Sequence, residues 1–398
     1  MRMSKKKEIV PKLRFPEFQG NGIDFLYGNR LFESITNKNY NSDLPILAIT
    51  QDQGAVPRDQ IEYNVTVTDK SLSNYKVVEV GDFIISLRSF QGGIEYSRFK
   101  GICSPAYIIL RKREESISEL YYKYYFKTWK YIQSLNRNLE GIRDGKMISY
   151  SQFSSIKVSY PRLFEEQQKI ADCLSSIDEL IDAESRKLKA LEKYKKGLMQ
   201  KLFPAEGKTL PEWRFPEFQA CGGWEICTVK GSFDTITPPK KIVKSEYNNS
   251  GKYPIVDQSQ EYIAGWTDDE TAIVPYRRPL IIFGDHTCVL KFMSQPFAQG
   301  ADGIKILSAN HKLDEKFAYY CLENIPLNSN GYQRHYSALK EFIIKFPDRN
   351  SGEQQKIADC LSEIDTMITE QSDKVEQLKI HKKGLMQGLF PSLEEADE

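Results

Sequence analysis

The sequence contains no hydrophobic run long enough to cross a bilayer. Its longest apolar stretches, 83–85 and 280–283, have the length of short strands, whereas a membrane-spanning helix needs about 20 apolar residues. The lysines at 5–7 are followed by no apolar segment, so we expect no secretory signal. Basic and acidic side chains nearly cancel, 55 against 54, which argues against a protein that coats polyanions without selectivity. We therefore expect a folded cytoplasmic protein.

Motifs for catalysis, metal binding and cofactor binding are also missing. The seven cysteines are scattered, and no Cys-x-x-Cys occurs, so we expect neither a disulfide framework nor a zinc site. The four histidines have no metal-ligand spacing, and no Gly-x-Gly-x-x-Gly or Asn/Asp-Pro-Pro-aromatic motif is present. The sequence predicts a chain that catalyses nothing and holds no metal or cofactor. The alternative is an enzyme whose motifs have degenerated.

An internal duplication organises the chain. The segment EQQKIADCLS occurs at 166–175 and again at 353–362, and each copy runs without a gap into a similar ending, KKGLMQKLFP and KKGLMQGLFP. A second repeated piece, RFPEFQ, occurs at 14–19 and 214–219. Chance does not produce an ungapped match of this length, so the chain consists of two units that share a framework and carry different inserts.

The repeated segments are predicted to be long helices, because neither contains an internal proline and each ends at Leu-Phe-Pro. Their apolar residues alternate in steps of three and four, which is typical of a coiled-coil seam. The predicted interface residues are Ile170, Leu174, Ile177, Ile181, Leu188, Leu191 and Leu198 in the first helix, and Ile357, Leu361, Ile364, Ile368, Val375, Leu378 and Leu385 in the second. Polar residues interrupt both seams at matched places, Glu184 with Gln371 and Lys195 with Lys382.

Charge predicts the direction in which the helices pack. Residues 165–184 carry one basic and seven acidic side chains, whereas 185–203 carry seven basic and one acidic. The second helix has the same polarity, with a net charge of −4 over 353–371 and +2 over 372–390. Antiparallel packing brings acidic halves against basic halves, so we expect an antiparallel pair with pseudo-twofold symmetry. Complementation of the helix dipole alone is the alternative, but it does not explain the heptads.

The predicted fold class is α+β, with two globular domains joined by the two antiparallel coiled-coil helices. The predicted segments are a lead at 1–20, a first globular domain at 21–164, a helix at 165–203, a lead with a second globular domain at 204–352, a helix at 353–391 and an acidic tail at 392–398.

Short β-segments and one helix are expected in each globular domain. In the first, 75–87 is predicted to form strand, turn and strand around Gly81-Asp82, and 106–110 another strand. An aromatic-rich helix is predicted over 118–135. Its aromatic residues alternate with lysines, as in a base-stacking platform, but burial of the aromatic face is the simpler interpretation. The second domain repeats the pattern with 280–283, 303–307 and a helix over 314–324.

Taken together, these segments resemble the specificity subunits of type I restriction-modification systems. The resemblance covers essentially the whole chain and rests on the RFPEF leads, the EQQKIA helix starts and the KKGLMQ–LFP helix ends. It is supported by VGDFII at 80–85, SPAY at 104–107 and GYQRHY at 331–336. It implies two target-recognition domains, each binding half of a split, asymmetric double-stranded DNA site. It also implies partners, namely two methyltransferase subunits that carry S-adenosylmethionine and restriction subunits that use ATP and Mg²⁺.

Residues that could contact bases are predicted from side-chain chemistry and loop position, because Arg, Lys, Gln and His present the donors and acceptors that groove edges require. Arg88 follows the strand at 83–87 into a Gly-Gly loop, and Arg143 and Lys146 lie in a Gly-rich loop. The candidates are Arg88, Gln91, Arg143 and Lys146 in the first domain and Arg277, Arg278, His286, Gln333, Arg334 and His335 in the second. An ordinary surface role is the alternative for each. A coiled-coil scaffold that binds only proteins is the alternative for the chain.

Overall fold

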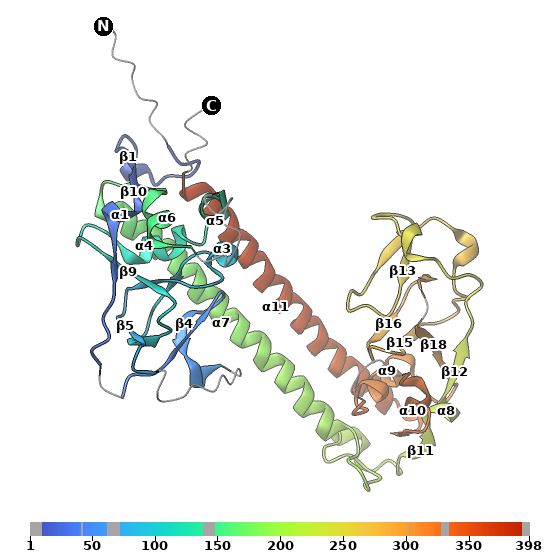
Figure 1. Cartoon of the computed structure of the whole chain (residues 1–398). Coiled ribbons are helices and arrows are strands. Elements are labelled where there is room, and N and C mark those ends of the chain that lie inside the picture. Colours follow the sequence, from blue (N-terminus) through green and yellow to red (C-terminus); the bar gives the residue numbers. More distant parts are fainter. Residues whose placement is uncertain are drawn as a thin grey trace. The chain divides into compact units, whose positions relative to one another are not determined.

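The computed structural model describes residues 10–40, 43–61, 72–137, 148–301, 303–327 and 334–391. It divides into two compact units, Met1–Ser185 with Lys374–Glu398 and Arg186–Asp373. The division passes through both long helices, α7 (Phe164–Leu202) and α11 (Glu353–Leu389), so each unit contains one half of each helix (Figure 1). The first unit is therefore assembled from both ends of the chain.

The central sheet of the first unit is antiparallel, with strand order β2-β9-β6-β7. Two-stranded pairs β1-β10, β3-β4 and β5-β8 surround it. The strands are β1 (Ile23–Tyr27), β2 (Phe32–Ile35), β3 (Leu47–Thr50), β4 (Gly54–Pro57), β5 (Lys76–Val78), β6 (Phe83–Ile85), β7 (Glu95–Tyr96), β8 (Gly101–Cys103), β9 (Ile108–Lys112) and β10 (Lys157–Pro161). The helical elements are η1 (Pro16–Phe18), α1 (Gly28–Leu31), η2 (Arg58–Gln60), α3 (Ser89–Gly92), α4 (Glu119–Tyr125), α5 (Trp129–Arg137) and α6 (Tyr150–Ser155).

The strand, turn and strand predicted over 75–87 are confirmed, whereas the single helix predicted over 118–135 was wrong. The segments at 76–78 and 83–85 are both strands, and Gly81 takes a positive φ of 96° between them, but they do not pair with each other. Strand β5 pairs with β8, and β6 pairs with β7 and β9. The helix expected over 118–135 is divided into α4 and α5 by a turn at 126–128. Long-range pairing and packing decide both points, and local sequence patterns do not record them.

Burial of the aromatic side chains of α4 forms the core of the first unit. Tyr121, Tyr122 and Phe126 are fully buried. The ring of Phe32 contacts the rings of Tyr122, at 5.0 Å between centroids, and of Phe83, at 5.4 Å, in edge-to-face geometry, the arrangement that aromatic quadrupoles favour. The simpler interpretation of this aromatic segment is therefore correct for α4.

The second unit repeats the central sheet with the order β12-β18-β15-β16, accompanied by β11-β19 and a three-stranded sheet β14-β13-β17. Its strands are β11 (Glu225–Thr228), β12 (Phe233–Ile236), β13 (Tyr253–Val256), β14 (Gly265–Thr267), β15 (Leu280–Gly284), β16 (Leu290–Met293), β17 (Ala298–Gln299), β18 (Ile304–Ala309) and β19 (Ile343–Phe346). Its helical elements are η3 (Pro216–Phe218), α8 (Val229–Ser232), η4 (Lys244–Glu246), η5 (Glu270–Ala272), α9 (Glu315–Glu323), α10 (Tyr336–Leu339) and η6 (Arg349–Ser351). The α+β class is confirmed in both units.

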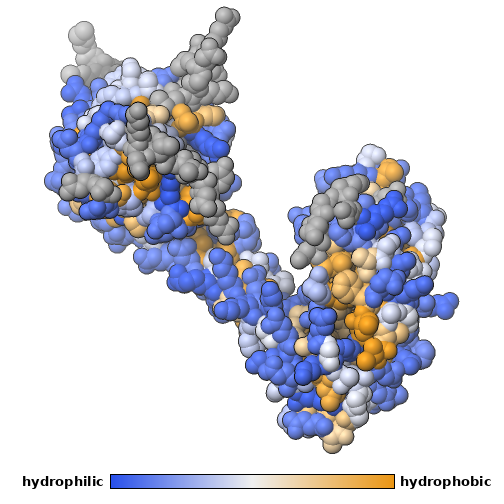
Figure 2. All heavy atoms as spheres, turned by 60° about the horizontal axis from the view of Figure 1, so that its bottom comes forward, coloured by the Kyte–Doolittle hydropathy of each residue, from blue (hydrophilic) through white to orange (hydrophobic). Residues whose placement is uncertain are grey.

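Within each unit the two half-helices pack antiparallel, as their charges predict. In the first unit Lys382 pairs with Asp178 at 2.5 Å and Lys374 pairs with Glu184 at 2.6 Å. In the second, Lys195 pairs with Asp365 at 2.7 Å. These pairs join the acidic N-terminal half of one helix to the basic C-terminal half of the other. The fourteen predicted seam residues all lie buried or half-buried, and hydrophilic residues cover much of the visible face of the long helices (Figure 2).

Each RFPEF lead connects the two half-helices of its unit. In the first unit the Leu13 amide donates to the Gly388 carbonyl near the end of α11, at 2.9 Å. In the second the Trp213 amide donates to the Lys201 carbonyl near the end of α7, at 3.0 Å. Positions 13 and 213, and 201 and 388, are equivalent in the duplication, so the same clamp is built twice.

All seven cysteines are free, and only Cys103 and Cys321 are buried. None of the described helices is long and apolar enough to span a membrane. No cluster of metal-binding side chains occurs within the described ranges.

Candidate nucleic-acid interface

The loops that follow β6 and β15 occupy equivalent places in the two units. In the first sheet Ile84 lies opposite Ile109, which lies opposite Ile35. In the second, Ile282 lies opposite Ile306, which lies opposite Ile236. Arg88 lies four residues after Ile84, and His286 lies four residues after Ile282. Equivalent strands of the two units thus lead into loops that carry different hydrogen-bonding side chains.

Arg88 and Gln91 lie on one loop, and a hydrogen bond from the neighbouring β3–β4 turn holds that loop in place. Both side chains are exposed, and Arg88 precedes the single turn of α3. The amide of Gln51 in the β3–β4 turn donates to the Arg88 carbonyl at 3.3 Å. A side chain at Gly92 would collide with Gln51, because a Cβ there would lie 2.8 Å from its amide carbon. A larger residue at position 92 would therefore displace the Gln51 side chain and its hydrogen bond to Arg88.

The ammonium of Lys127 binds the inner side of this loop, opposite the solvent. It donates to the backbone carbonyls of Gln51, at 3.1 Å, and Gly92, at 2.9 Å, and to the carboxylate of Glu95, at 2.5 Å. Burial raises the pKa of Glu95, and the charge of Lys127 opposes that rise. Lys127 therefore organises the loop, while Arg88 and Gln91 face solvent.

Further cations gather around Tyr107, near the same loop. Burial raises the pKa of the Tyr107 phenol, and the positive charges of Arg58 and Arg88 partly oppose that rise. Lys76 donates to the Tyr107 carbonyl at 2.7 Å, and burial, with Lys38 nearby, lowers its pKa. Such a concentration of positive charge suits the phosphate contacts that dominate DNA affinity.

Sequence reasoning missed Lys38, Arg58 and Lys76. They lie far apart along the chain and have no shared motif. The pairing of β5 with β8 and the bridge between Ile46 and Ile102 bring their segments together, and neither pairing has a local signal.

In the second unit the β15–β16 turn is fastened to the segment that begins at Arg334. The Asp285 carbonyl accepts from the His335 amide at 2.8 Å, and its carboxylate accepts from the Tyr336 amide at 2.8 Å. Cys288 in this turn takes a positive φ of 56°, which is uncommon outside glycine and marks a constrained turn. His286 in the turn and the exposed Arg334 are therefore held on neighbouring segments.

Buried polar atoms and cations accompany this turn. Among the described residues, the buried Nε2 atom of His335 and the buried Oε1 atom of Gln258 have no hydrogen-bond partner, which is unusual in a folded protein. The ammonium groups of Lys305 and Lys340 both lie 5.5 Å from the ring centroid of Tyr336. This part of the second unit thus combines positive charge with unused hydrogen-bonding capacity.

The remaining predicted contacts fall into three groups. Arg277 is exposed. Arg278 is half-buried, with its guanidinium 3.3 Å from Glu315 and hydrogen-bonded to the Ala309 carbonyl, so it stabilises the unit itself. Arg143, Lys146 and Gln333 lie outside the described residues. The structure therefore brings together Arg88 with Gln91, and His286 with Arg334 and His335.

Comparison with known proteins shows the family to which both halves of the chain are similar. The family model described as the type I restriction modification DNA specificity domain matches residues 25–193 and again 222–379. The two matches follow the internal duplication, so each unit contains one copy of the domain.

Individual relatives agree with the family match. The specificity subunit of the type I restriction enzyme MjaVIII from Methanocaldococcus jannaschii is 24% identical over 351 residues, which cover 81% of this chain and 80% of that protein. A putative type I restriction enzyme MjaX specificity subunit from the same organism is 26% identical over 306 residues, covering 70% and 69%.

Solved structures show the same fold. The S subunit of a type I restriction-modification system from M. genitalium superposes with a TM-score of 0.62 at 16% identity, covering 97% of this chain and all of that one. A chain from a structural study of complex assembly and conformational transition of the type I R-M system superposes with a TM-score of 0.54 at 16% identity, covering 93% and 97%.

Proposed function

The chain belongs to the type I restriction modification DNA specificity family, and from this premise we propose that it recognises a bipartite, asymmetric DNA site with a fixed gap. Membership of the family implies recognition of a DNA target. The observation that carries the two-part site is the duplicated framework that presents unlike side chains at equivalent loops, Arg88 in the first unit and His286 in the second. Two different recognition surfaces suit two different half-sites.

The two loop clusters have the chemistry for base recognition. Arginine donates bidentately to guanine, glutamine pairs with adenine, and histidine offers one donor or acceptor at a base edge. Arg88 and Gln91 supply this chemistry in the first unit, and His286 and Arg334 in the second. The cations around Tyr107 and Tyr336 supply charge for phosphate contacts, which position the protein without selecting a sequence.

We further propose that the chain directs partners that carry the chemistry. These are two methyltransferase subunits that bind S-adenosylmethionine and restriction subunits that use ATP and Mg²⁺. The chain itself is then a non-catalytic, cytoplasmic subunit without its own cofactor. The exposed faces of α7 and α11 are available for such partners, and family membership supports the assignment.

An exchange of one recognition domain tests the proposal. Residues 21–160 are replaced by the matching block of a relative, the chain is co-expressed with its methyltransferase partner, and methylated bases are mapped across the host genome. We expect one half-site to change while the other half-site and the gap stay the same. A change in both half-sites contradicts the bipartite model. Absence of a mobility shift with DNA in the presence of the partner would favour the protein-binding scaffold.

A further inference from the structure

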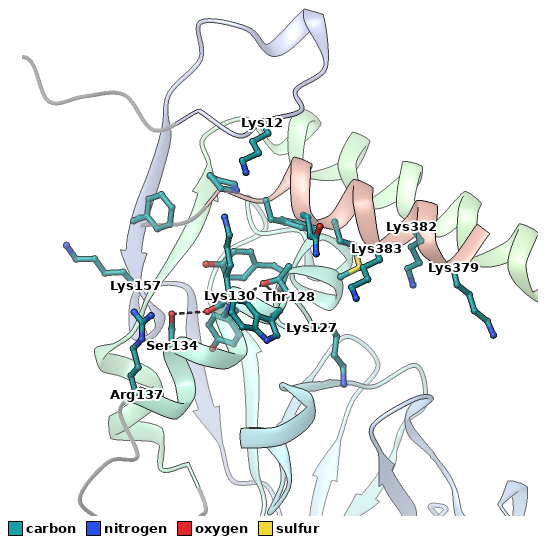
Figure 3. Close-up of a pocket in the computed structure, with 18 residues that line it drawn as sticks. Lys12, Lys127, Thr128, Lys130, Ser134, Arg137, Lys157, Lys379, Lys382 and Lys383 are labelled. Carbon is teal, nitrogen blue, oxygen red and sulfur yellow. Dashed lines mark hydrogen bonds between the residues drawn. The ribbon is translucent and has the colours of Figure 1, made fainter. Parts of the chain in front are cut away.

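The first unit contains a pocket of about 800 Å³ whose lining does not include Arg88 or Gln91. Its walls are the turn before α5 and α5 itself, the ribbon of β1 and β10, and the last turns of α11. Figure 3 shows Lys12, Lys130 and Lys383 reaching this hollow from three separate segments. A volume of this size is within the range of small-ligand and cofactor sites, roughly 300–1,000 Å³.

The lining is basic. Lys12, Lys130, Arg137, Lys157, Lys379 and Lys383 all contribute to it. Lys127 and Lys382 line it as well. Some of these cations also have partners within the unit, since Lys127 pairs with Glu95, Lys382 with Asp178 and Lys379 with Glu376. Among the described residues that line the pocket there is no Asp or Glu. Like charges gathered in one hollow repel each other, so an anionic occupant would be stabilised there.

One aromatic side chain adds stacking capacity. Trp129 lines the pocket and is 68% exposed, which is unusual for so large an apolar side chain. Its ring can therefore pack against a flat apolar or aromatic group of a bound molecule.

The duplication supplies an internal comparison. The second unit has a hollow at the equivalent place, lined by Gln200, Phe203 and Ile343, which correspond to Gln387, Phe390 and Lys157. Its lining includes Glu206 and Glu341. It is lined by two lysines, Lys208 and Lys345. The ammonium of Lys345 donates to the backbone carbonyls of Ala205 and Lys208. The hollow therefore belongs to the shared framework, whereas the basic lining belongs to the first unit.

We propose that the pocket of the first unit binds a nucleoside phosphate, with the base against Trp129 and the phosphates among the lysine ammonium groups. Seven of the eight cations are lysines, which bind phosphate as point charges, whereas carboxylate recognition favours the arginine fork. Stacking on tryptophan is tolerant of base identity, so the site selects the class of ligand and not one nucleobase.

Calorimetric titration of the full chain with ATP tests the proposal, with adenosine and inorganic tripolyphosphate as partial ligands. We expect one site for ATP, with each partial ligand weaker by on the order of tenfold or more. Lys383→Gln should weaken ATP binding by on the order of tenfold. Its matched control is Lys196→Gln, the equivalent exposed lysine on α7, which should leave ATP binding unchanged. Trp129→Ala should weaken the binding of ATP but not that of tripolyphosphate.

Three outcomes overturn the proposal. The first is no ATP binding at millimolar concentration. The second is equal affinity for ATP and tripolyphosphate with no effect of Trp129→Ala, which shows polyanion binding only. The third is tighter binding of a poly-glutamate peptide than of ATP in a Lys383-dependent manner, which assigns the pocket to an acidic protein segment. None of these outcomes depends on recognition of DNA by the Arg88 and His286 loops.

Discussion

Arg14 donates two hydrogen bonds to the carboxylate of Glu166, at 2.8 and 2.9 Å, and both side chains are almost fully buried, with 6% and 1% of their areas exposed. The second unit repeats this pair as Arg214 with Glu353, at 2.7 and 2.6 Å. The arginine comes from the RFPEF lead, and the glutamate begins the EQQKIA helix. The two most recognisable motifs of the sequence are therefore the two halves of one ion pair.

Removal of Arg14 should destabilise the first unit strongly. Arg14→Ala leaves the Glu166 carboxylate buried without its partner, and loss of one member of a buried pair typically costs about 3–5 kcal/mol. The measurement is the free energy of unfolding in urea. Arg162→Ala is the control, because Arg162 forms a similar two-bond pair with Asp24 on the surface, where about 0–1 kcal/mol is expected. Equal losses for the two variants would contradict this account.

Lys123 should make stability depend on pH in the alkaline range. Burial, with repulsion from Arg98 and Lys382, lowers its pKa from 10.5 to about 8, although Asp178 opposes the shift. Between about pH 8 and 10.5 the unfolded chain binds this proton and the folded chain does not, so the contribution of Lys123 to stability rises with pH across that window. Lys123→Met should flatten the rise in urea unfolding. Lys189→Met, at an exposed position of α7, should not flatten it.

Arg88 and His286 should affect different halves of the DNA site. If each contacts a base, Arg88→Ala should relax one position of one half-site, His286→Ala one position of the other, and each should weaken binding by about 1–3 kcal/mol. Mapping of methylated motifs after co-expression with the methyltransferase partner gives the readout. Lys189→Ala serves as the control for loss of a surface cation. Relaxation of the same half-site by both variants would show that the two loops do not act separately.

The long helices should set the gap between the half-sites. One heptad inserted at Glu184 and one at Gln371 keeps the seam in phase and lengthens each helix by about 10 Å at ~1.5 Å per residue. Since DNA rises ~3.4 Å per base pair, the preferred gap should grow by up to about three base pairs while both half-sites stay the same. Rotation of the second half-site about the DNA axis could lower activity, so the methylated motif is the decisive measurement. An unchanged gap with full activity would exclude the helices as the spacer.

Periodicity and charge in the sequence were enough to predict the framework. The seam positions, the antiparallel direction and the α+β class depend on local spacing and on complementary charge, as the pairs of Lys382 with Asp178 and Lys195 with Asp365 show. The loops were harder. Arg88 and His286 could be proposed from chemistry, but their equivalence depends on strand register. The cluster of Lys38, Arg58 and Lys76 depends on pairing between distant strands, and the role of Arg278 depends on Glu315, which no local pattern connects to it.

The break between α4 and α5 was missed for a related reason. The aromatic spacing of 118–135 continues through the break, but packing determines where the helix ends. Tyr124 donates to Asp178 of α7 at 2.8 Å, and its counterpart Tyr320 donates to Asp365 of α11 at 2.7 Å. These contacts fix α4 and α9 against the long helices, and after them the chain turns in both units.

The clamp formed by each lead has a consequence for inheritance. Because the lead at Leu13 meets the end of α11 and the lead at Trp213 meets the end of α7, lead, recognition domain and helix follow one another in a closed cycle. Each set of lead, recognition domain and helix therefore meets equivalent segments at its two ends. Recombination between the gene segments that encode the two EQQKIADCLS copies would exchange a whole recognition domain and rebuild both buried arginine–glutamate pairs. Such a gene could acquire a new DNA target in one crossover. No further mutations would be needed to restore the framework.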